Sequence, residues 1–290
     1  MPSYRFCRPD DIPFLVKAIN HCYNVHFPGL PEMTVDAFRE EMKALSVWPS
    51  NSMVARNGDD PIAVLIGTKR VDEVLILRMG VHPEHLHQGH GSHLMTSLSQ
   101  KLAVLGPPRL IVEVPTALPG LRDFVQAVHY RYEATYTDYV WRPDTVKPVP
   151  DGLIIPATVQ DLLDDGALTV PNGVAWVRSS ETLALGKDDL QGLAIASPER
   201  IEAWLLYPAP ESLVWPRGNV LDVVALGCRD PERRSLFVSL LLRDLATKND
   251  GLTIRLPRLS AMEATDLDVE ALGFIAGATY ERHAAVASPG

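Results

Sequence analysis

The residues best arranged for chemistry lie between Leu75 and Met95, where an apolar run ends at Pro83 and a short polar segment carries Gly89 and Gly91. Apolar residues then recur at the spacing of an amphipathic helix. The first N–H groups of a helix have no partner within it, and the helix dipole places roughly half a positive charge there. Glycine, which lacks a Cβ atom, lets this backbone approach an anion closely. The pattern predicts a phosphate-binding turn between a strand and a helix, with an ordinary tight turn as the alternative.

The order of these residues resembles the acyl-CoA signature of the GNAT N-acetyltransferase superfamily. Val81-His82-Pro83 matches its V-x-P element, Gln88-Gly89-His90-Gly91-Ser92 matches the end of R/Q-x-x-G-x-G/A, and a helix follows. The sequence departs from the signature at Leu86, where the family usually has Arg or Gln. The resemblance implies that the loop amides hold the pyrophosphate of CoA, which gives a cofactor-binding role to His87, Gln88, Gly89, His90, Gly91 and Ser92.

The resemblance also implies a reaction: direct transfer of an acetyl group from acetyl-CoA, the co-substrate, to a primary amine within a ternary complex. In GNAT folds the strand before the loop meets the pantetheine and the thioester, which assigns cofactor contacts to Met79, Gly80 and Val81. A main-chain N–H near Met79 is expected to polarise the thioester carbonyl. The alternative is that the same residues belong only to a core strand.

The general base and acid are less clearly marked. Many relatives have a tyrosine acid in a short helix, four residues before a Gly-Phe pair, and this chain has Val125 at that position. Tyr130, Tyr132 and Tyr136 are nearby, and His129 could shuttle a proton; of these, we take Tyr136 as the acid candidate. The base candidates are Glu73, at the start of the central strand, and Glu113, near the end of the next one. A buried lone carboxylate has a raised pKa and suits base catalysis, whereas an exposed one is an ordinary turn residue.

A histidine cluster provides a rival interpretation of the same stretch. His82, His85, His87, His90 and His93 fall within twelve residues, a spacing that can recruit zinc or nickel. No cysteine or second cluster supplies further ligands, so we expect no metal.

The elements that position this loop follow the GNAT order β-α-α-β-β-β-α-β-α-β over the first half of the chain. We expect an α/β (α+β) fold whose mixed, mostly antiparallel central sheet is flanked by helices. The expected strands are 4–7, 52–56, 62–69, 74–81, 109–114 and 131–141, and the expected helices are 12–25, 35–45, 89–105 and 121–128.

The second half repeats this order at an offset near 144, with Ala278-Thr279-Tyr280 matching Ala134-Thr135-Tyr136. The sequence therefore predicts a GNAT domain over residues 1–142, a Pro-rich linker over 143–151 and a degenerate GNAT-like domain over 152–290. In place of the glycine loop, the second copy has Glu232-Arg233-Arg234-Ser235-Leu236. We expect this domain to bind no CoA, with an anion site at Arg233 and Arg234 as the alternative.

Composition limits the remaining possibilities. The 290 residues carry a net charge of −9, of which −8 falls on residues 151–290, so nucleic acid is not an expected partner. Three cysteines far apart in the sequence, no signal peptide and no run of 18 apolar residues indicate a cytoplasmic protein that does not span a membrane. The sequence leaves the acceptor amine open and allows a homodimer. A non-catalytic acyl-CoA-binding or regulatory module remains the alternative to an enzyme.

Overall fold

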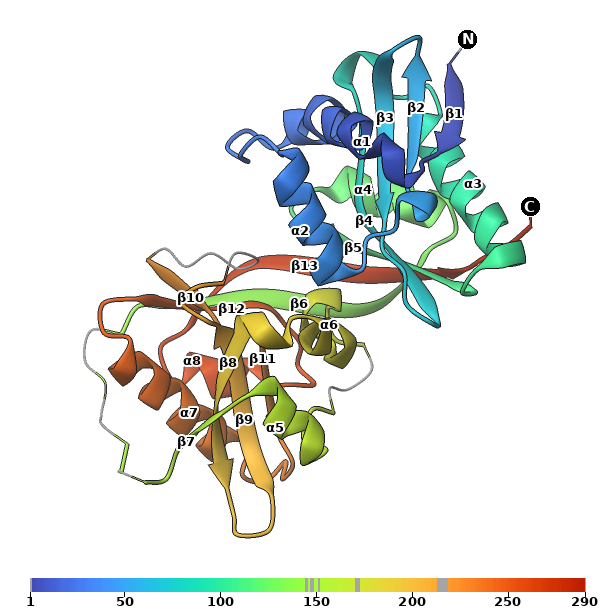
Figure 1. Cartoon of the computed structure of the whole chain (residues 1–290). Coiled ribbons are helices and arrows are strands. Elements are labelled where there is room, and N and C mark those ends of the chain that lie inside the picture. The colour runs from blue at the N-terminus through green and yellow to red at the C-terminus, as the bar shows by residue number, and fades with distance from the viewer. Residues whose placement is uncertain are drawn as a thin grey trace. The chain divides into compact units, whose positions relative to one another are not determined.

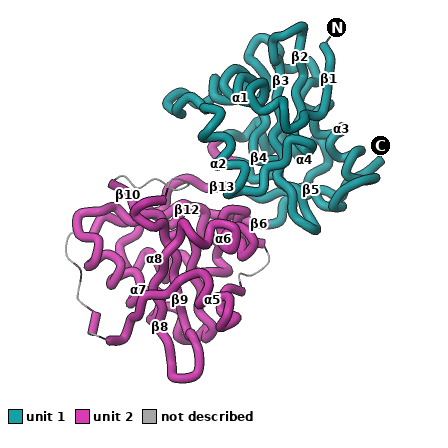
Figure 2. The backbone as a smooth tube through the Cα atoms, in the orientation of Figure 1, with its two compact units in different colours: residues 1–114, 118–133, 282–290 teal, residues 115–117, 134–281 magenta. Residues whose placement is uncertain are grey.

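The computed structural model describes residues 2–143, 146, 149–150, 152–169, 173–212 and 219–289. The chain forms two compact units, coloured separately in Figure 2. Unit 1 contains residues 1–114, 118–133 and 282–290, and unit 2 contains residues 115–117 and 134–281. The end of the chain therefore returns to unit 1. Of the expected linker 143–151, residues 144, 145, 147, 148 and 151 lie outside the described residues.

Unit 1 contains the glycine loop and most elements of the first half of the chain (Figure 1). Its strands are β1 (Ser3–Phe6), β2 (Met53–Asn57), β3 (Asp60–Gly67), β4 (Glu73–Val81) and β5 (Arg109–Pro115), together with the start of β6 (Arg131–Trp141). Its helices are α1 (Ile12–Ala18), α2 (Val35–Leu45), α3 (His90–Leu105) and α4 (Pro119–Ala127).

Strands β1 to β5 are neighbours in sequence order. Strands β1 to β4 pair antiparallel, and β5 pairs parallel to β4 because α3 carries the chain back across the sheet. On one face, residues such as Val74 and Val112 pack with Leu94 and Leu98 of α3. On the other face, Val64 and other strand residues pack with α1 and α2. Alternating side chains thus bury both faces of the sheet.

The expected helix 12–25 is regular only as far as Ala18. The chain continues as a π turn over Ile19–Tyr23, which packs against β3 and β4. A Cβ atom on Gly80 of β4 would lie 2.3 Å from the carbonyl oxygen of Cys22. Glycine at this position therefore lets the π turn approach the strand backbone.

Unit 2 has a related arrangement built from short elements. Its strands are β7 (Ile155–Ala157), β8 (Leu190–Ala196), β9 (Ile201–Pro208), β10 (Val220–Asp222), β11 (Ala225–Cys228), β12 (Thr253–Leu259), most of β13 (Ile275–Val286) and the rest of β6. Its helices are α5 (Val159–Asp164), α6 (Ser180–Leu185), α7 (Arg234–Lys248) and α8 (Asp266–Glu270).

In unit 2 the segment equivalent to β4 is divided into two strands. β10 pairs parallel to β12, whereas β11 pairs antiparallel to β9 in the order β11-β9-β8-β7. Both units therefore have a mixed sheet that is mostly antiparallel and flanked by helices, which confirms the expected fold class. Among the described residues, no helix is long and apolar enough to cross a bilayer.

Candidate active site

The candidate site of unit 1 begins where β4 and β5 part. The two strands pair from Glu73 and Arg109 up to Ile76 and Val112, and their ladder ends there. β3 continues to pair with β4 up to Val81, after a register shift between Ile66 and Gly67. We call the place where β4 leaves β5 the fork of unit 1. Past this point, β4 has a neighbouring strand on one side only.

The backbone of β4 beyond the fork faces the open side at alternate residues. The N–H of His82 donates to the carbonyl oxygen of Ile62 on β3 at 2.9 Å. Because hydrogen-bonding direction alternates along an antiparallel pair, the N–H and C=O groups of Met79 and Val81 point away from β3. Consistent with this direction, Val81 O lies 2.7 Å from Nε2 of His26 rather than bonding to β3. A main-chain N–H at Met79 therefore faces the side where β5 has left the sheet.

The loop after β4 contains two residues with left-handed backbone. A 3₁₀ turn covers Pro83–His85, and two residues then have positive φ, His87 at 59° and Gly89 at 83°. Left-handed residues in a loop can turn neighbouring N–H groups to the same side, which is a geometry that binds anions. Gly89 tolerates its angle because it lacks a Cβ atom.

The loop and the first turn of α3 present unused donors. Among the described residues, no acceptor lies within hydrogen-bonding range of the backbone N–H groups of residues 87–92. The ladder of α3 begins with the N–H of His93, which donates to Gly89 O at 3.0 Å. These donors lie at the positive end of the helix dipole and together favour a phosphate group.

Gly91 keeps the first turn of α3 close to its neighbours. A Cβ atom there would lie 3.3 Å from Cζ of Phe124 in α4 and 3.8 Å from Cε of Met79. The strand residue and the loop residue assigned to the cofactor are therefore adjacent. Gly80, the third strand residue with this assignment, packs its Cα face against Cys22 instead.

His90 faces the protein interior. Its side chain is buried, and its Nδ1 lies 2.6 Å from the hydroxyl oxygen of Tyr4. Burial, followed by the nearby His85 and His93, lowers the pKa of His90 below 6.5. Nε2 of His90 has no hydrogen-bond partner among the described residues. The neutral ring is thus part of the support beneath the loop.

Of the other histidines of the stretch, His82, His85 and His93 contact other rings and not one common point. His82 stacks on His21 at 4.4 Å, and His93 lies 3.9 Å from the ring of Tyr4. No group of three or more histidine, cysteine, aspartate or glutamate side chains in the described part of the chain could hold a metal ion.

Glu73 lies at the closed end of the strand pair, before the fork. Its Oε2 is 2.9 Å from Nη2 of Arg282 and 3.4 Å from Nε of Arg109, and both arginines also pair with Glu133. At about 3.3 Å per residue, Glu73 and Met79 are roughly 20 Å apart along the strand. Glu73 therefore belongs to an ion-pair network at a distance from the open side.

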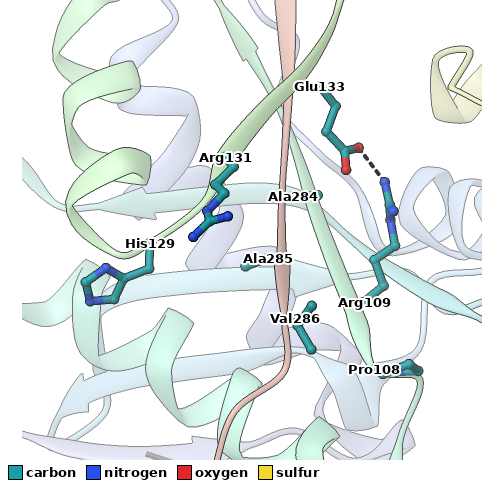
Figure 3. Close-up of a pocket in the computed structure, with 8 residues that line it drawn as sticks. All are labelled: Pro108, Arg109, His129, Arg131, Glu133, Ala284, Ala285 and Val286. Carbon is teal, nitrogen blue, oxygen red and sulfur yellow. Dashed lines mark hydrogen bonds and ion pairs between the residues drawn. The ribbon is translucent and has the colours of Figure 1, made fainter.

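A surface pocket of about 690 Å³ lies beside this network. Arg109, Arg131 and Ala284 are among its lining residues, and Figure 3 shows the side chain of Arg109 meeting Glu133. The pocket occupies the end of β5 where its pairing with β4 begins, so it is separate from the loop.

Glu113 lies one residue beyond the last paired position of β5, Val112. Val112 and Val114 pack on the α3 face, so alternation directs Glu113 to the opposite face, on which α1 and α2 pack. Its side chain is half-buried. Of the three candidate acid and base residues, Glu113 is the one that lies at the fork of unit 1.

Tyr136 falls in unit 2, where its buried hydroxyl donates to the carbonyl oxygen of Gly173 at 2.9 Å. Val125, at the position where relatives have the acid, is buried in the α3 face core. The structure thus brings together Met79, Val81 and the loop, with Glu113 at the fork, and leaves Glu73 and Tyr136 elsewhere.

Arg78 was not among the site residues predicted from the sequence. This residue makes a bidentate ion pair with Glu41 of α2, with Nη2 to Oε2 at 2.7 Å, and its guanidinium lies 5.8 Å from the centre of the Tyr23 ring. The sequence signal for Arg78 was a single charged residue in the middle of an otherwise apolar strand. Its partner could not be identified from the sequence because the two residues are 37 positions apart.

Comparisons with known proteins agree with this geometry. The sequence profile of the acetyltransferase (GNAT) family matches residues 15–127, which include the fork and the loop. A GCN5-related N-acetyltransferase from Sphaerobacter thermophilus has the same fold with a TM-score of 0.66 and 14% identity, covering 100% of this chain and 96% of that one. No curated protein matches the sequence.

Two further solved structures share the fold over the whole chain. A tandem GNAT protein from the clavulanic acid biosynthesis pathway has a TM-score of 0.65 and 13% identity, with 100% of both chains covered. A putative acetyltransferase from Pyrococcus horikoshii has a TM-score of 0.62 and 16% identity, covering 99% of this chain and 90% of that one. The family profile supports acyl transfer as the general reaction. Residues 15–127 therefore match the GNAT family, and the chain as a whole has the fold of a tandem GNAT protein.

Proposed function

We propose that unit 1 binds acetyl-CoA and transfers its acetyl group directly to a primary amine of an acceptor molecule. The observation that carries this proposal is the row of backbone N–H groups over residues 87–92, which have no acceptor among the described residues. These donors stand at the end of a strand whose Met79 backbone faces the open side of the fork. A pyrophosphate on the loop and a thioester along β4 match these two features.

In this proposal the loop amides, including those of Gly89 and Gly91, hold the pyrophosphate, because the donors and the helix dipole both favour negative charge. The Met79 N–H stabilises the oxyanion that forms when the amine attacks the thioester carbonyl. A fixed backbone donor suits this task because it is oriented before the charge develops. Val81 supplies further backbone contacts beside the cofactor.

Glu113 is the base in this proposal. The attacking amine must lose a proton, and Glu113 is the candidate carboxylate placed at the fork. As the C–S bond breaks, the thiolate of CoA leaves and takes up the proton that Glu113 removed from the amine, which restores the thiol. Tyr136 is not needed for this step, and Glu73 instead stabilises the closed end of the strand pair through Arg282 and Arg109.

The loop assignment is tested by Gly89→Glu, with Gly58→Glu as the matched control. Both glycines have positive φ and open space around a built Cβ atom, so both variants carry the same strain and the same added charge. We expect Gly89→Glu to abolish acetyl-CoA binding, measured by calorimetry, with an unchanged far-UV spectrum. Gly58→Glu, in the turn between β2 and β3, should bind as the wild type does. Retained binding in Gly89→Glu would refute the loop assignment.

A non-catalytic acyl-CoA-binding module is the second candidate function. Val125, buried where relatives have the tyrosine acid, and Leu86, exposed where they have Arg or Gln, favour it. The two functions differ in turnover. An enzyme releases free CoA thiol, detected with a thiol reagent, when it is supplied with acetyl-CoA and a panel of primary amines. A binding module retains acetyl-CoA under the same conditions and releases no thiol above the background rate.

A further inference from the structure

Unit 2 contains a charged pair in its interior. Arg178, at the end of a 3₁₀ turn over Trp176–Arg178, and Glu263, just after β12, both have fully buried side chains. Nε of Arg178 donates to both carboxylate oxygens of Glu263, at 2.8 and 3.0 Å. Two charges removed from water are costly unless they are paired and hydrogen-bonded. Nη2 of Arg178 has no hydrogen-bond partner among the described residues, so the pairing with Glu263 and the bonds of Nη1 must offset most of that cost.

The guanidinium of Arg178 also bridges two strands. Its Nη1 donates to Val223 O and to Pro257 O, both at 2.9 Å. Val223 follows β10, and Pro257 lies within β12. β10 and β12 pair in parallel up to Asp222 and Arg255, and the N–H of Val223 still donates to Arg255 O. Arg178 therefore bonds to both strands at the point where they part, which we call the fork of unit 2.

The strand registers in the two units show that the fork of unit 2 is equivalent to the fork of unit 1. The first paired residues are Val220 with Thr253 in unit 2, and Glu73 with Arg109 in unit 1. Counting along each strand from these pairs matches Val223 with Ile76 and Pro257 with Glu113. The guanidinium in unit 2 thus contacts the equivalents of the residues that border the open side in unit 1.

Pro257 explains why an arginine is needed here. In a parallel ladder of this register, the residue at position 257 would donate its N–H to the carbonyl oxygen of Val223. Proline has no N–H and cannot make that bond. Nη1 of Arg178 supplies the missing donor. In unit 1 the equivalent residue, Glu113, keeps its N–H, and the fork needs no such replacement.

We infer that Arg178 and Glu263 form an internal plug, which fills the fork of unit 2 and prevents an acyl-CoA pantetheine arm from entering it. The inference rests on the proposed function, because it takes the equivalent fork of unit 1 as the cofactor site. It goes beyond the loss of the glycine loop, since it means that a restored loop would not by itself restore a site. The chain then has two separate barriers to cofactor binding in unit 2.

The first test measures acetyl-CoA binding by calorimetry in the Gly89→Glu background, in which unit 1 is expected not to bind acetyl-CoA. A loop graft gives unit 2 the loop of unit 1 through Glu232→Gln, Arg233→Gly, Arg234→His, Ser235→Gly and Leu236→Ser. We expect no binding by the graft alone. Adding Arg178→Ser and Glu263→Ser should produce binding at least about tenfold tighter than the detection limit that the graft alone fails to reach. Adding Arg200→Ser and Glu202→Ser, an exposed pair in the same unit, should leave binding absent.

Two results of this test would overturn the inference. One is binding by the graft while the plug is intact. The other is an absence of binding when the folded variant carries both the graft and the open fork. Wild-type protein is titrated in the same series, so a failure of the proposed function is seen separately as an absence of wild-type binding.

The second test does not depend on acetyl-CoA. Arg178→Ala should leave a space of guanidinium shape beside Glu263, and methylguanidinium chloride at millimolar concentration should bind there and raise the melting temperature. Arg200→Ala, which removes an exposed guanidinium, is the control and should show no such rise. Equal responses of the two variants would contradict the plug. If Arg178→Ala does not fold alone, recovery of folded protein in methylguanidinium but not in equimolar NaCl supports the plug, and no recovery contradicts it.

Discussion

The two forks of this protein are made from the same strand pairing and are completed in opposite ways. In unit 1, β4 continues past Ile76 with a backbone that faces an open side and leads into a loop of unused N–H donors. In unit 2, the equivalent point is closed by Arg178, which bonds to both strands and to Glu263. We infer that binding at a fork depends on which side chains enter it, since the parallel strand pairing that precedes the fork is the same in both units.

The base at the fork provides the largest expected effect. Unit 1 has Glu113 where unit 2 has Pro257, so Glu113→Gln should make unit 1 as inert as unit 2 in proton transfer. We expect kcat to fall by about 10²- to 10⁴-fold with acetyl-CoA binding unchanged, because general base catalysis typically contributes that much. Steady-state thiol release and calorimetry measure the two quantities.

Glu73→Gln is the control for this prediction. Glu73 lies in the ion-pair network with Arg109 and Arg282, so its loss should change kcat far less than the loss of Glu113. A larger kcat effect at Glu73 than at Glu113 would reverse the assignment of the base.

The plug gives the next largest effect, on stability. Arg178→Met leaves Glu263 as a buried unpaired carboxylate, and we expect the free energy of unfolding to fall by about 3 to 5 kcal/mol. Arg178→Met combined with Glu263→Leu removes both charges and should recover most of that loss. Urea unfolding measures both variants, and a small effect of the single substitution would show that the pair is not tightly held in the fork.

Alanine substitutions of Gly80 and Gly227, which occupy equivalent strand positions, should destabilise the protein by different amounts. A Cβ atom on Gly80 would lie 2.3 Å from the backbone oxygen of Cys22, whereas on Gly227 it would lie 2.7 Å from the ring of Trp204. Overpacking usually costs about 1 to 3 kcal/mol, and a ring can shift more easily than a backbone. Gly80→Ala should therefore lower the melting temperature more than Gly227→Ala does. The opposite order would show that the backbone of the π turn shifts more easily than the ring of Trp204.

The smallest effect is expected beneath the loop, where unit 1 has buried His90. Tyr4→Phe removes the hydroxyl that pairs with Nδ1 and should cost about 1 kcal/mol, the usual net value of one hydrogen bond. The pKa of His90 is lowered in the folded state, so the unfolded chain takes up a proton first as the pH falls. Stability should therefore decline below about pH 6.5.

The pH dependence is checked by thermal melts of wild-type protein and His90→Gln between pH 5 and 7. The slope of melting temperature against pH should be smaller in the variant, because it lacks the group that titrates differently in the two states. Equal slopes would mean that His90 does not contribute to the acid sensitivity of unit 1.

Local signals in the sequence predicted much of unit 1. Apolar alternation indicated β2, β3 and β4, and apolar spacing indicated α2, which Thr34 caps by accepting from the N–H of Ala37. The glycine loop was located because glycine at positive φ is a backbone requirement that can be recognised in a sequence. These features depend on neighbouring residues, and so the sequence alone was sufficient.

Other features depend on contacts across the fold. The return of residues 282–290 to unit 1 could not be predicted from the repeat, because strand exchange leaves the order of elements unchanged. Arg178 and Glu263 are 85 positions apart and belong to no motif, so only the register of β10 and β12 brings them together at the fork. The same reason explains why Arg78 was missed.

The central claim is that unit 1 has an acyl-CoA site and unit 2 has none. Calorimetric titration of acetyl-CoA into the full chain tests it directly through the fitted stoichiometry. We expect one molecule per chain, with all binding lost in Gly89→Glu and retained in Gly58→Glu. A stoichiometry of two would place a cofactor in unit 2, and binding that survives Gly89→Glu would show that the loop of unit 1 is not the site; either result contradicts the claim.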